Sequence, residues 1–156
     1  MKLDLKSSPR HIKRLQNIAK VISGLGDVRV VIDDNTKGPY FDPVNKVCVL
    51  PNGDYSDDDF VSLIEGFTCH EAGHGRYTDS EVYSDAFNSV LKSSEGFTRF
   101  DDGMNAEFES LAEKRKAYSR AKRLTGLINL FDDVQMEEKV GNDYPDAKRR
   151  LAATYA

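Results

Sequence analysis

The sequence has 156 residues, of which 39% are hydrophobic and 31% charged, and its formal net charge is −4. This length is typical of one domain that can bury a core, and the acidic balance argues against a nucleic-acid-binding domain, which usually carries a basic surplus. No apolar run approaches the roughly 20 residues needed to cross a bilayer, and the N-terminus lacks the apolar stretch of a secretory signal. The two cysteines make no disulfide framework. We therefore expect a single domain over residues 1–156 in the cytoplasm, with reduced thiols and with no membrane or nucleic-acid partner.

The first third of the chain predicts a helix followed by a small sheet. Residues 8–24 carry apolar side chains at helical spacing, with Pro9 in the first turn and a glycine at the end. Alternating apolar residues over 28–32 and over 46–50 predict strands, which we expect to pair as a hairpin with a long connection. This places a small β-sheet between residues 28 and 50.

A second helix is predicted over residues 56–78, with Ser56 or Asp57 as its cap. Acidic residues fill its first turn, where the helix dipole favours negative charge. His70 and His74 continue its apolar stripe. We therefore expect both imidazoles to point toward the protein interior.

The remainder of the chain is predicted to be mostly helical, which makes the fold class α+β with helices dominant. Residues 80–93 show a helical pattern, residues 93–105 have the composition of a loop, and from about Asn105 the pattern is helical again as far as Gly141. A last helix is expected after residue 142. The buried face of the long helix is expected to carry Leu127, Phe131 and Val134.

Two of the three histidines stand in the pattern His-Glu-x-x-His, as His70 and His74. Residues four apart on a helix lie on one side of it, so both rings can offer a nitrogen to one ion. Glu71 lies about 100° around the axis, within reach of a water but not placed as a third ligand. The pattern is typical of zincins, in which the glutamate is the general base. Ala72 and Gly73 are small enough for close packing. The alternative is a pair of core histidines bonded to backbone.

A catalytic zinc ion keeps three protein ligands, so a third ligand must come from elsewhere in the chain. Asp133 fits best, because Glu137 one turn further on can orient a histidine. Asp132 is the rival ligand, and the acids of this helix could instead form a solvated face. The other candidates are expected to bind no metal: a solvated His11 and two core cysteines, Cys48 and Cys69.

The ordered set of motifs resembles a known family. The histidine motif is followed by Gly-Arg-Tyr-Thr-Asp, then by Asn-Leu-Phe-Asp-Asp-Val-Gln-Met-Glu over residues 129–137, then by Tyr-Pro-Asp-Ala from Tyr144. This set, over about residues 28–151, is similar to the T-subunit family of cobaltochelatase. It is more similar to bacterial and bacteriophage relatives with a metallopeptidase-like domain ahead of a von Willebrand A domain.

The resemblance implies a zincin-like fold of the glutamate-zincin (gluzincin) type, with His70, His74 and an acid of the second motif on Zn²⁺, and with Glu71 as the base. The chain departs from the family pattern at Asp132, where relatives carry glutamate, and at Gln135, where they carry arginine. The von Willebrand A domain is missing. The chain is therefore expected to be the N-terminal piece of a longer protein or a stand-alone version.

Two functions from different classes are compatible with these residues. The first is a zinc metallopeptidase, a hydrolase in which the strand at 46–50 edges the cleft and pairs with an extended peptide or protein substrate. Tyr77, or a tyrosine from residues 80–104, could stabilise the oxyanion, although Tyr77 also suits packing at a helix end.

The second function is an inactive zincin-like adaptor or chelatase-type module, in which the metal holds two helices together. The resemblance implies a MoxR-type or other AAA+ ATPase, or a von Willebrand A domain, as its partner. The charged run at 112–123 could be a docking face or a solvated helix surface. A phage-encoded factor that binds a host protein in the host cytoplasm is a further alternative.

Overall fold

The computed structural model describes residues 8–92, 97–101, 105–108 and 111–155. It divides into two compact units, of which the first comprises Met1–Thr78 with Asp133–Ala156 and the second comprises Asp79–Asp132. The described residues are mostly helical with a small three-stranded sheet, which confirms the predicted α+β class. The single domain stays a prediction, because two compact units can belong to one domain.

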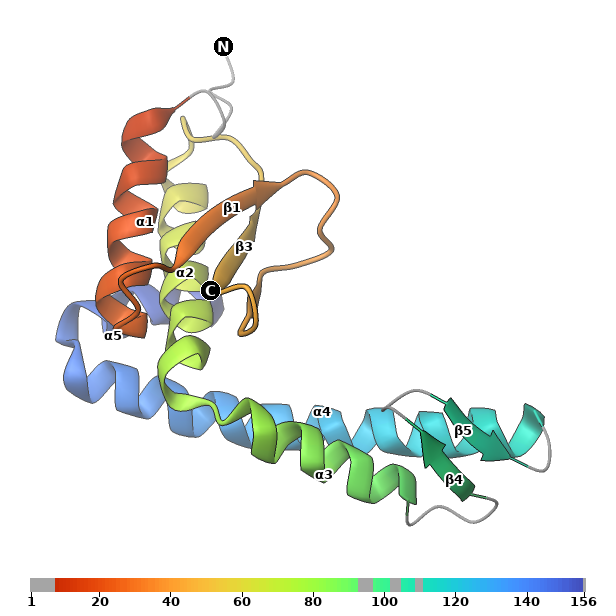
Figure 1. The fold of residues 1–156 in the computed structure, drawn as a ribbon. Helices are drawn as coiled ribbons and strands as arrows, with labels where there is room; N and C mark the ends of the chain where they lie inside the picture. The colour runs from red at the N-terminus through yellow and green to blue at the C-terminus, as the bar shows by residue number, and fades with distance from the viewer. Residues whose placement is uncertain (1–7, 93–96, 102–104, 109–110, 156) are drawn as a thin grey trace. The chain divides into compact units, whose positions relative to one another are not determined.

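The first unit is built around two helices whose ends follow from local sequence. Helix α1 (Pro9–Ser23) begins at a proline and ends at Gly24, whose left-handed conformation (φ 69°) lets its N–H donate to the Lys20 carbonyl at 3.1 Å. Helix α2 (Asp58–Tyr77) begins after Asp57, whose carboxylate accepts two amide hydrogen bonds of the first turn. The two helices lie side by side (Figure 1).

The sheet has the strand order β1-β3-β2, with β3 (Val47–Pro51) in the centre. Strand β1 (Arg29–Asp33) pairs with β3 in parallel, so the predicted hairpin between these two strands is wrong. The hairpin is formed instead by β2 (Tyr40–Asp42) and β3, which are antiparallel. Apolar alternation predicts a strand but not its direction, and β2 is too short to show a pattern.

Small residues on α2 let other segments of the first unit approach it closely. A Cβ atom on Gly73 would overlap Met136 Sδ and would lie 2.9 Å from Val140 Cγ2, both on α4 (Leu111–Asp143). A Cβ atom on Gly66 would overlap the backbone carbonyl of Arg150 in α5 (Pro145–Ala152). The histidine-motif helix and the acidic-motif helix, which a zincin-like fold would bring together, are therefore in close contact at Gly73.

The second unit contains a hairpin that the sequence pattern did not predict. Helix α3 (Ser80–Lys92) lies where a helix was expected. Strands β4 (Phe97–Asp101) and β5 (Asn105–Phe108) pair antiparallel, where a loop and the start of a helix were predicted. The rest of the predicted loop lies outside the described residues.

The predicted buried face of α4 is wrong. Leu127, Phe131 and Val134 have 52%, 67% and 62% of their surface exposed, whereas Met136 and Val140 are almost fully buried. The helix also continues to Asp143, two residues beyond the predicted stop at Gly141. Helical spacing identifies an apolar stripe, but only tertiary packing decides which stripe is covered.

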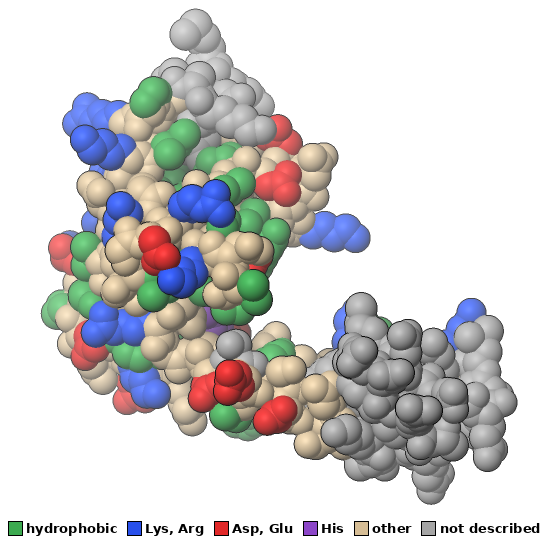
Figure 2. All heavy atoms as spheres, in the orientation of Figure 1, with side chains coloured by type: hydrophobic (Ala, Val, Ile, Leu, Met, Phe, Trp, Pro, Cys, Tyr) green, Lys and Arg blue, Asp and Glu red, His purple; other side chains and the backbone are tan. Residues whose placement is uncertain are grey.

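The surface of the first unit mixes charges of both signs. On its visible face, Lys and Arg side chains are interspersed with Asp and Glu side chains (Figure 2). Among the described residues, no helix is long and apolar enough to cross a membrane.

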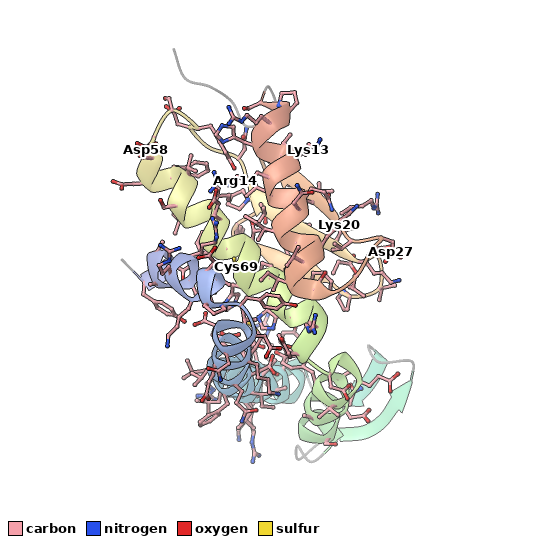
Figure 3. All side chains as sticks on the ribbon, turned by 90° about the vertical axis from the view of Figure 1, so that its left-hand side faces the viewer. Lys13, Arg14, Lys20, Asp27, Asp58 and Cys69 are labelled. Carbon is pink, nitrogen blue, oxygen red and sulfur yellow. The ribbon has the colours of Figure 1, made fainter. Side chains whose placement is uncertain are left out.

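A buried carboxylate joins three helices of the first unit. Only 7% of the Glu65 side chain is exposed, and it pairs with Arg14 of α1 through Nε–Oε1 at 2.6 Å and Nη2–Oε2 at 3.1 Å. Arg150 of α5 pairs with the other side of the same carboxylate. Figure 3 shows Arg14 extending from α1 toward α2, while Lys13 and Lys20 lie on the outer side of α1. Two guanidinium groups therefore share the single negative charge of Glu65, between α1, α2 and α5.

We expect Glu65→Gln to lower the free energy of unfolding by about 1–3 kcal/mol, because it leaves the partly buried Arg150 guanidinium and the more exposed Arg14 guanidinium without a counter-charge. Urea unfolding followed by circular dichroism measures this, since the chain has no tryptophan. The matched control is Asp27→Asn, which breaks an exposed pair with Lys46 and should leave the unfolding midpoint unchanged within scatter. Equal effects of the two substitutions would contradict the conclusion that the buried Glu65 carboxylate stabilises the contact of the three helices.

Candidate metal centre

Helix α2 carries both histidines of the motif on one side, one turn apart. About a fifth of each side chain is exposed, 20% for His70 and 21% for His74. Asp133 comes from the part of α4 that belongs to the same compact unit. The close approach of α4 at Gly73 brings this carboxylate to the two imidazoles.

The three side chains place their donor atoms around one point. The two Nε2 atoms lie 3.2 Å apart, and Asp133 Oδ1 lies 3.2 Å from His74 Nε2 and 3.7 Å from His70 Nε2. A tetrahedral zinc ion with bonds of about 2.0–2.1 Å needs donor atoms about 3.3 Å apart. The observed separations match this requirement, so His70, His74 and Asp133 could hold one metal ion.

The remaining nitrogen of each imidazole is occupied by a second side chain. His70 Nδ1 lies 2.7 Å from Glu137 Oε1, and His74 Nδ1 lies 2.8 Å from Thr78 Oγ1. An N–H at Nδ1 that donates to Glu137 leaves the lone pair of His70 on Nε2, where a metal would bind. Glu137 therefore has the orienting position that the sequence predicted.

Glu71 lies deeper than the histidines, with only 6% of its surface exposed. Burial raises the pKa of its carboxyl to about 7; the positive form of His70 opposes this shift, and the charge of Asp133 adds to it. The backbone N–H of Phe41 donates to the Glu71 carboxylate and also favours its charged form. Glu71 is not a member of the ligand group, so its position suits a proton acceptor better than a ligand.

The other candidates have different surroundings. Asp132 belongs to no group of potential ligands among the described residues. The His11 ring contacts the Tyr55 ring edge-on at 4.5 Å between centroids, so it packs at the side of the core rather than standing in solvent. Cys48 and Cys69 are buried core thiols, as expected.

One expectation about the substrate cleft is wrong, and of the two roles suggested for Tyr77 one is favoured. Strand β3 cannot edge a cleft, because it is paired on both sides, whereas β2 is an edge strand of the described sheet. The Tyr77 hydroxyl donates to Asp143 Oδ2 at 2.5 Å, which favours the packing role at the helix end. Tyr83, the tyrosine of residues 80–104, lies in the second compact unit.

The charged run at 112–123 is exposed at its described side chains except for Ala121, which is fully buried. This exposure is equally typical of a docking face and of a solvated helix surface. It therefore does not separate the two predictions for this run.

Sequence reasoning missed three contributors to the site: Thr78, Phe41 and Tyr155. Thr78 could have been found, since it stands four residues after His74 at the helix end. Phe41 contributes a backbone N–H, which no side-chain pattern reveals. The Tyr155 hydroxyl donates to Glu137 Oε2 at 2.7 Å from a segment with no motif.

In comparisons with known proteins, no family model, no curated protein and no solved structure matches this chain.

We expect Asp133→Ala to weaken zinc binding by a factor of about 100 or more, because it removes one of three donor atoms. Asp132→Ala, the neighbouring substitution on the same helix, should leave zinc affinity unchanged. Competition with a chromophoric chelator measures both. A loss confined to Asp132→Ala would show that the other aspartate is the ligand.

The metal-free protein should lose stability as pH rises, because of Glu71. The pKa of this group is about 7 in the folded protein and 4.5 ordinarily, so between these values the unfolded chain releases a proton that the folded protein keeps. The contribution of Glu71 to the free energy of unfolding is constant below pH 4.5. It falls by about 3 kcal/mol between pH 4.5 and pH 7 and is constant again above pH 7.

The measurement is urea unfolding in EDTA at a series of pH values, compared with Glu71→Gln. The difference in unfolding free energy between the two proteins should shift in favour of the glutamine variant between pH 4.5 and pH 7. A pH-independent difference would contradict the raised pKa.

Proposed function

We propose that the protein is a zinc-dependent peptidase with a zincin-like fold, in which His70, His74 and Asp133 hold the ion and Glu71 is the general base. One observation carries this proposal. Three donor atoms from α2 and α4 lie at separations that suit one tetrahedral ion, next to a buried glutamate that is not a donor. The motif resemblance described above supports the same conclusion.

The residues of the chain would divide the chemistry between them. A zinc ion held at this site supplies a Lewis acid, which polarises a carbonyl oxygen and makes water more acidic. Glu71 accepts the proton of the attacking water and passes it to the leaving amine. A cation bound at this site would lower the pKa of Glu71 below its metal-free value of about 7, so the Glu71 carboxylate would be ionised and able to accept a proton at neutral pH.

The ligand group favours an open site over a closed structural one. Structural zinc is usually held by four protein ligands, whereas catalytic zinc keeps three and leaves one position for water or substrate. Within the described part of the chain, no fourth histidine, cysteine or carboxylate joins His70, His74 and Asp133. Three donors are the number that a hydrolytic centre requires.

The sheet offers a place for an extended substrate beside Glu71. The backbone of Phe41 in the edge strand β2 forms a hydrogen bond that favours the charged form of Glu71, so β2 lies beside the base. An extended peptide could pair with this edge through its main chain. We therefore assign to β2 the role that the sequence had suggested for residues 46–50.

The adaptor function is the second candidate, and exposed apolar side chains on α4 favour it. Leu127, Leu130 and Phe131 are each more than half exposed. Exposed apolar patches often mark protein contacts. In an adaptor, the metal would hold α2 against α4, and the partner would be a ring ATPase of the AAA+ class or a host protein.

Glu71→Gln separates the two functions. In a peptidase, the substitution removes the general base and should lower the cleavage rate by about 10² to 10⁴-fold, while zinc content stays at one ion per chain. Cleavage of a mixed library of internally quenched peptides measures the rate. Glu138→Gln, which changes an exposed glutamate on α4, is the matched control and should keep full activity.

Two outcomes would contradict the peptidase. One is a zinc-loaded wild-type protein that cleaves no peptide of the library. The other is a Glu71→Gln variant that cleaves as fast as the wild type. A loss of zinc in Glu71→Gln would instead show that Glu71 is itself a ligand.

A further inference from the structure

The two histidines of the centre are oriented in different ways. The partner of His74 is Thr78, four residues along the same chain segment, so the end of α2 provides it locally. The partner of His70 is Glu137, which lies 67 residues away on α4. The orientation of His70 therefore depends on tertiary structure. It depends in particular on the contacts that hold Glu137 in place.

Glu137 is fixed by contacts to both of its carboxylate oxygens. Oε1 lies 2.7 Å from His70 Nδ1, and Oε2 accepts a hydrogen bond from the Tyr155 hydroxyl at 2.7 Å. A carboxylate with a partner on each oxygen cannot rotate without breaking a contact. Since 16% of the Glu137 side chain is exposed, water would have to replace any lost partner.

Tyr155 is held near the site by a short segment that packs on α2. It ends the 3-10 turn η2 (Ala153–Tyr155), in which the Thr154 hydroxyl donates to the Leu151 carbonyl at 2.7 Å. A Cβ atom on Gly66 would lie 2.8 Å from Thr154 Cγ2, so this turn approaches α2 closely one turn before His70. The position of the Tyr155 hydroxyl therefore follows from backbone packing.

The ring of Tyr155 contributes little to the core. Its surface is 74% exposed, and it belongs to neither cluster of buried apolar residues. The hydrogen bond to Glu137 also raises the pKa of Tyr155 to about 12, as expected for a hydroxyl that donates to a carboxylate. The contact that distinguishes this side chain is thus the one made by its hydroxyl.

We propose that Tyr155 is a positioning residue of the metal centre, which acts through Glu137 to aim the Nε2 atom of His70 at the ion. The proposal rests on the metal-binding part of the proposed function. It adds a fourth chain segment to the site, because η2 joins α2, α4 and the edge strand β2. It also predicts that Tyr155 and Glu137 act as a unit rather than separately.

A double-mutant cycle with Tyr155→Phe and Glu137→Gln tests this. Zinc affinity is measured by competition with a chromophoric chelator, and the geometry of the centre is followed in the visible spectrum of the Co²⁺-loaded protein. Glu137→Gln should weaken zinc binding by about 10–100-fold, as is usual for the partner of a ligating histidine. Tyr155→Phe, one contact further out, should weaken it by about 3–10-fold and change the Co²⁺ spectrum.

In the Glu137→Gln background, Tyr155→Phe should have a clearly smaller effect on affinity and spectrum, because the tyrosine hydroxyl there contacts a neutral amide instead of the carboxylate. Tyr144→Phe is the matched control, because its hydroxyl also makes a hydrogen bond in the first unit, with Arg76 at 2.9 Å, but not with the site. It should leave zinc affinity and the Co²⁺ spectrum unchanged. Melting of the metal-free variants, followed by circular dichroism, should show that Tyr155→Phe folds like the wild type.

The outcomes separate this inference from the proposed function. A wild-type protein that binds no zinc would overturn both. A wild-type protein that binds zinc, with Tyr155→Phe equal to it, would overturn only the role of Tyr155. Equal losses of zinc affinity from Tyr155→Phe with and without Glu137 would also overturn it, since Tyr155 would then act independently of Glu137. A metal-free Tyr155→Phe variant that no longer folds would overturn it as well, since the role of Tyr155 would then be in folding.

Discussion

The centre depends on the absence of a side chain at Gly73. Because this position has no Cβ atom, Met136 and Val140 of α4 can lie directly against α2. Asp133 and Glu137 share one face of α4 with these two apolar residues, at the spacing of adjacent helical turns. The same contact therefore buries Met136 and Val140 and brings one carboxylate to the Nε2 atoms and another to His70 Nδ1.

The electrostatics of the site depend on the sheet as well as on α4. Glu71 is buried beside Phe41 of β2 and Cys48 of β3, and burial favours its neutral form. Asp133 increases this tendency, because two nearby carboxylates disfavour each other's charge. A bound cation would reverse both effects at once, so metal binding and ionisation of the base should support each other. Burial of the Glu71 charge without a metal costs free energy, and a bound cation would remove part of that cost. The buried glutamate therefore favours cation binding at this site.

The sequence predicted those parts of the site that depend on spacing along one helix. The positions of His70, His74 and Glu71 follow from helical geometry, and acids within an apolar helix pointed to Asp133 and Glu137. The parallel pairing of β1 with β3 could not be predicted, because it depends on how distant segments meet. Neither could the position of Tyr155, for the same reason. The buried face of α4 was predicted wrongly. Leu127 and Phe131 were expected to be buried, but they form an apolar stripe that is exposed in the described structure.

The two halves of the centre should form in sequence. The end of α2 with Thr78 orients His74 as soon as this helix forms, because all the atoms involved lie within one turn. His70 and Asp133 reach their final environment only when α4 docks at Gly73. An ion that binds His70, His74 and Asp133 together would therefore stabilise the docked state over the undocked one, by the differential binding that couples ligands to folding. One packing event thus brings the Asp133 carboxylate to the two imidazoles and orients His70 through Glu137, so loss of the α2–α4 contact would remove both together.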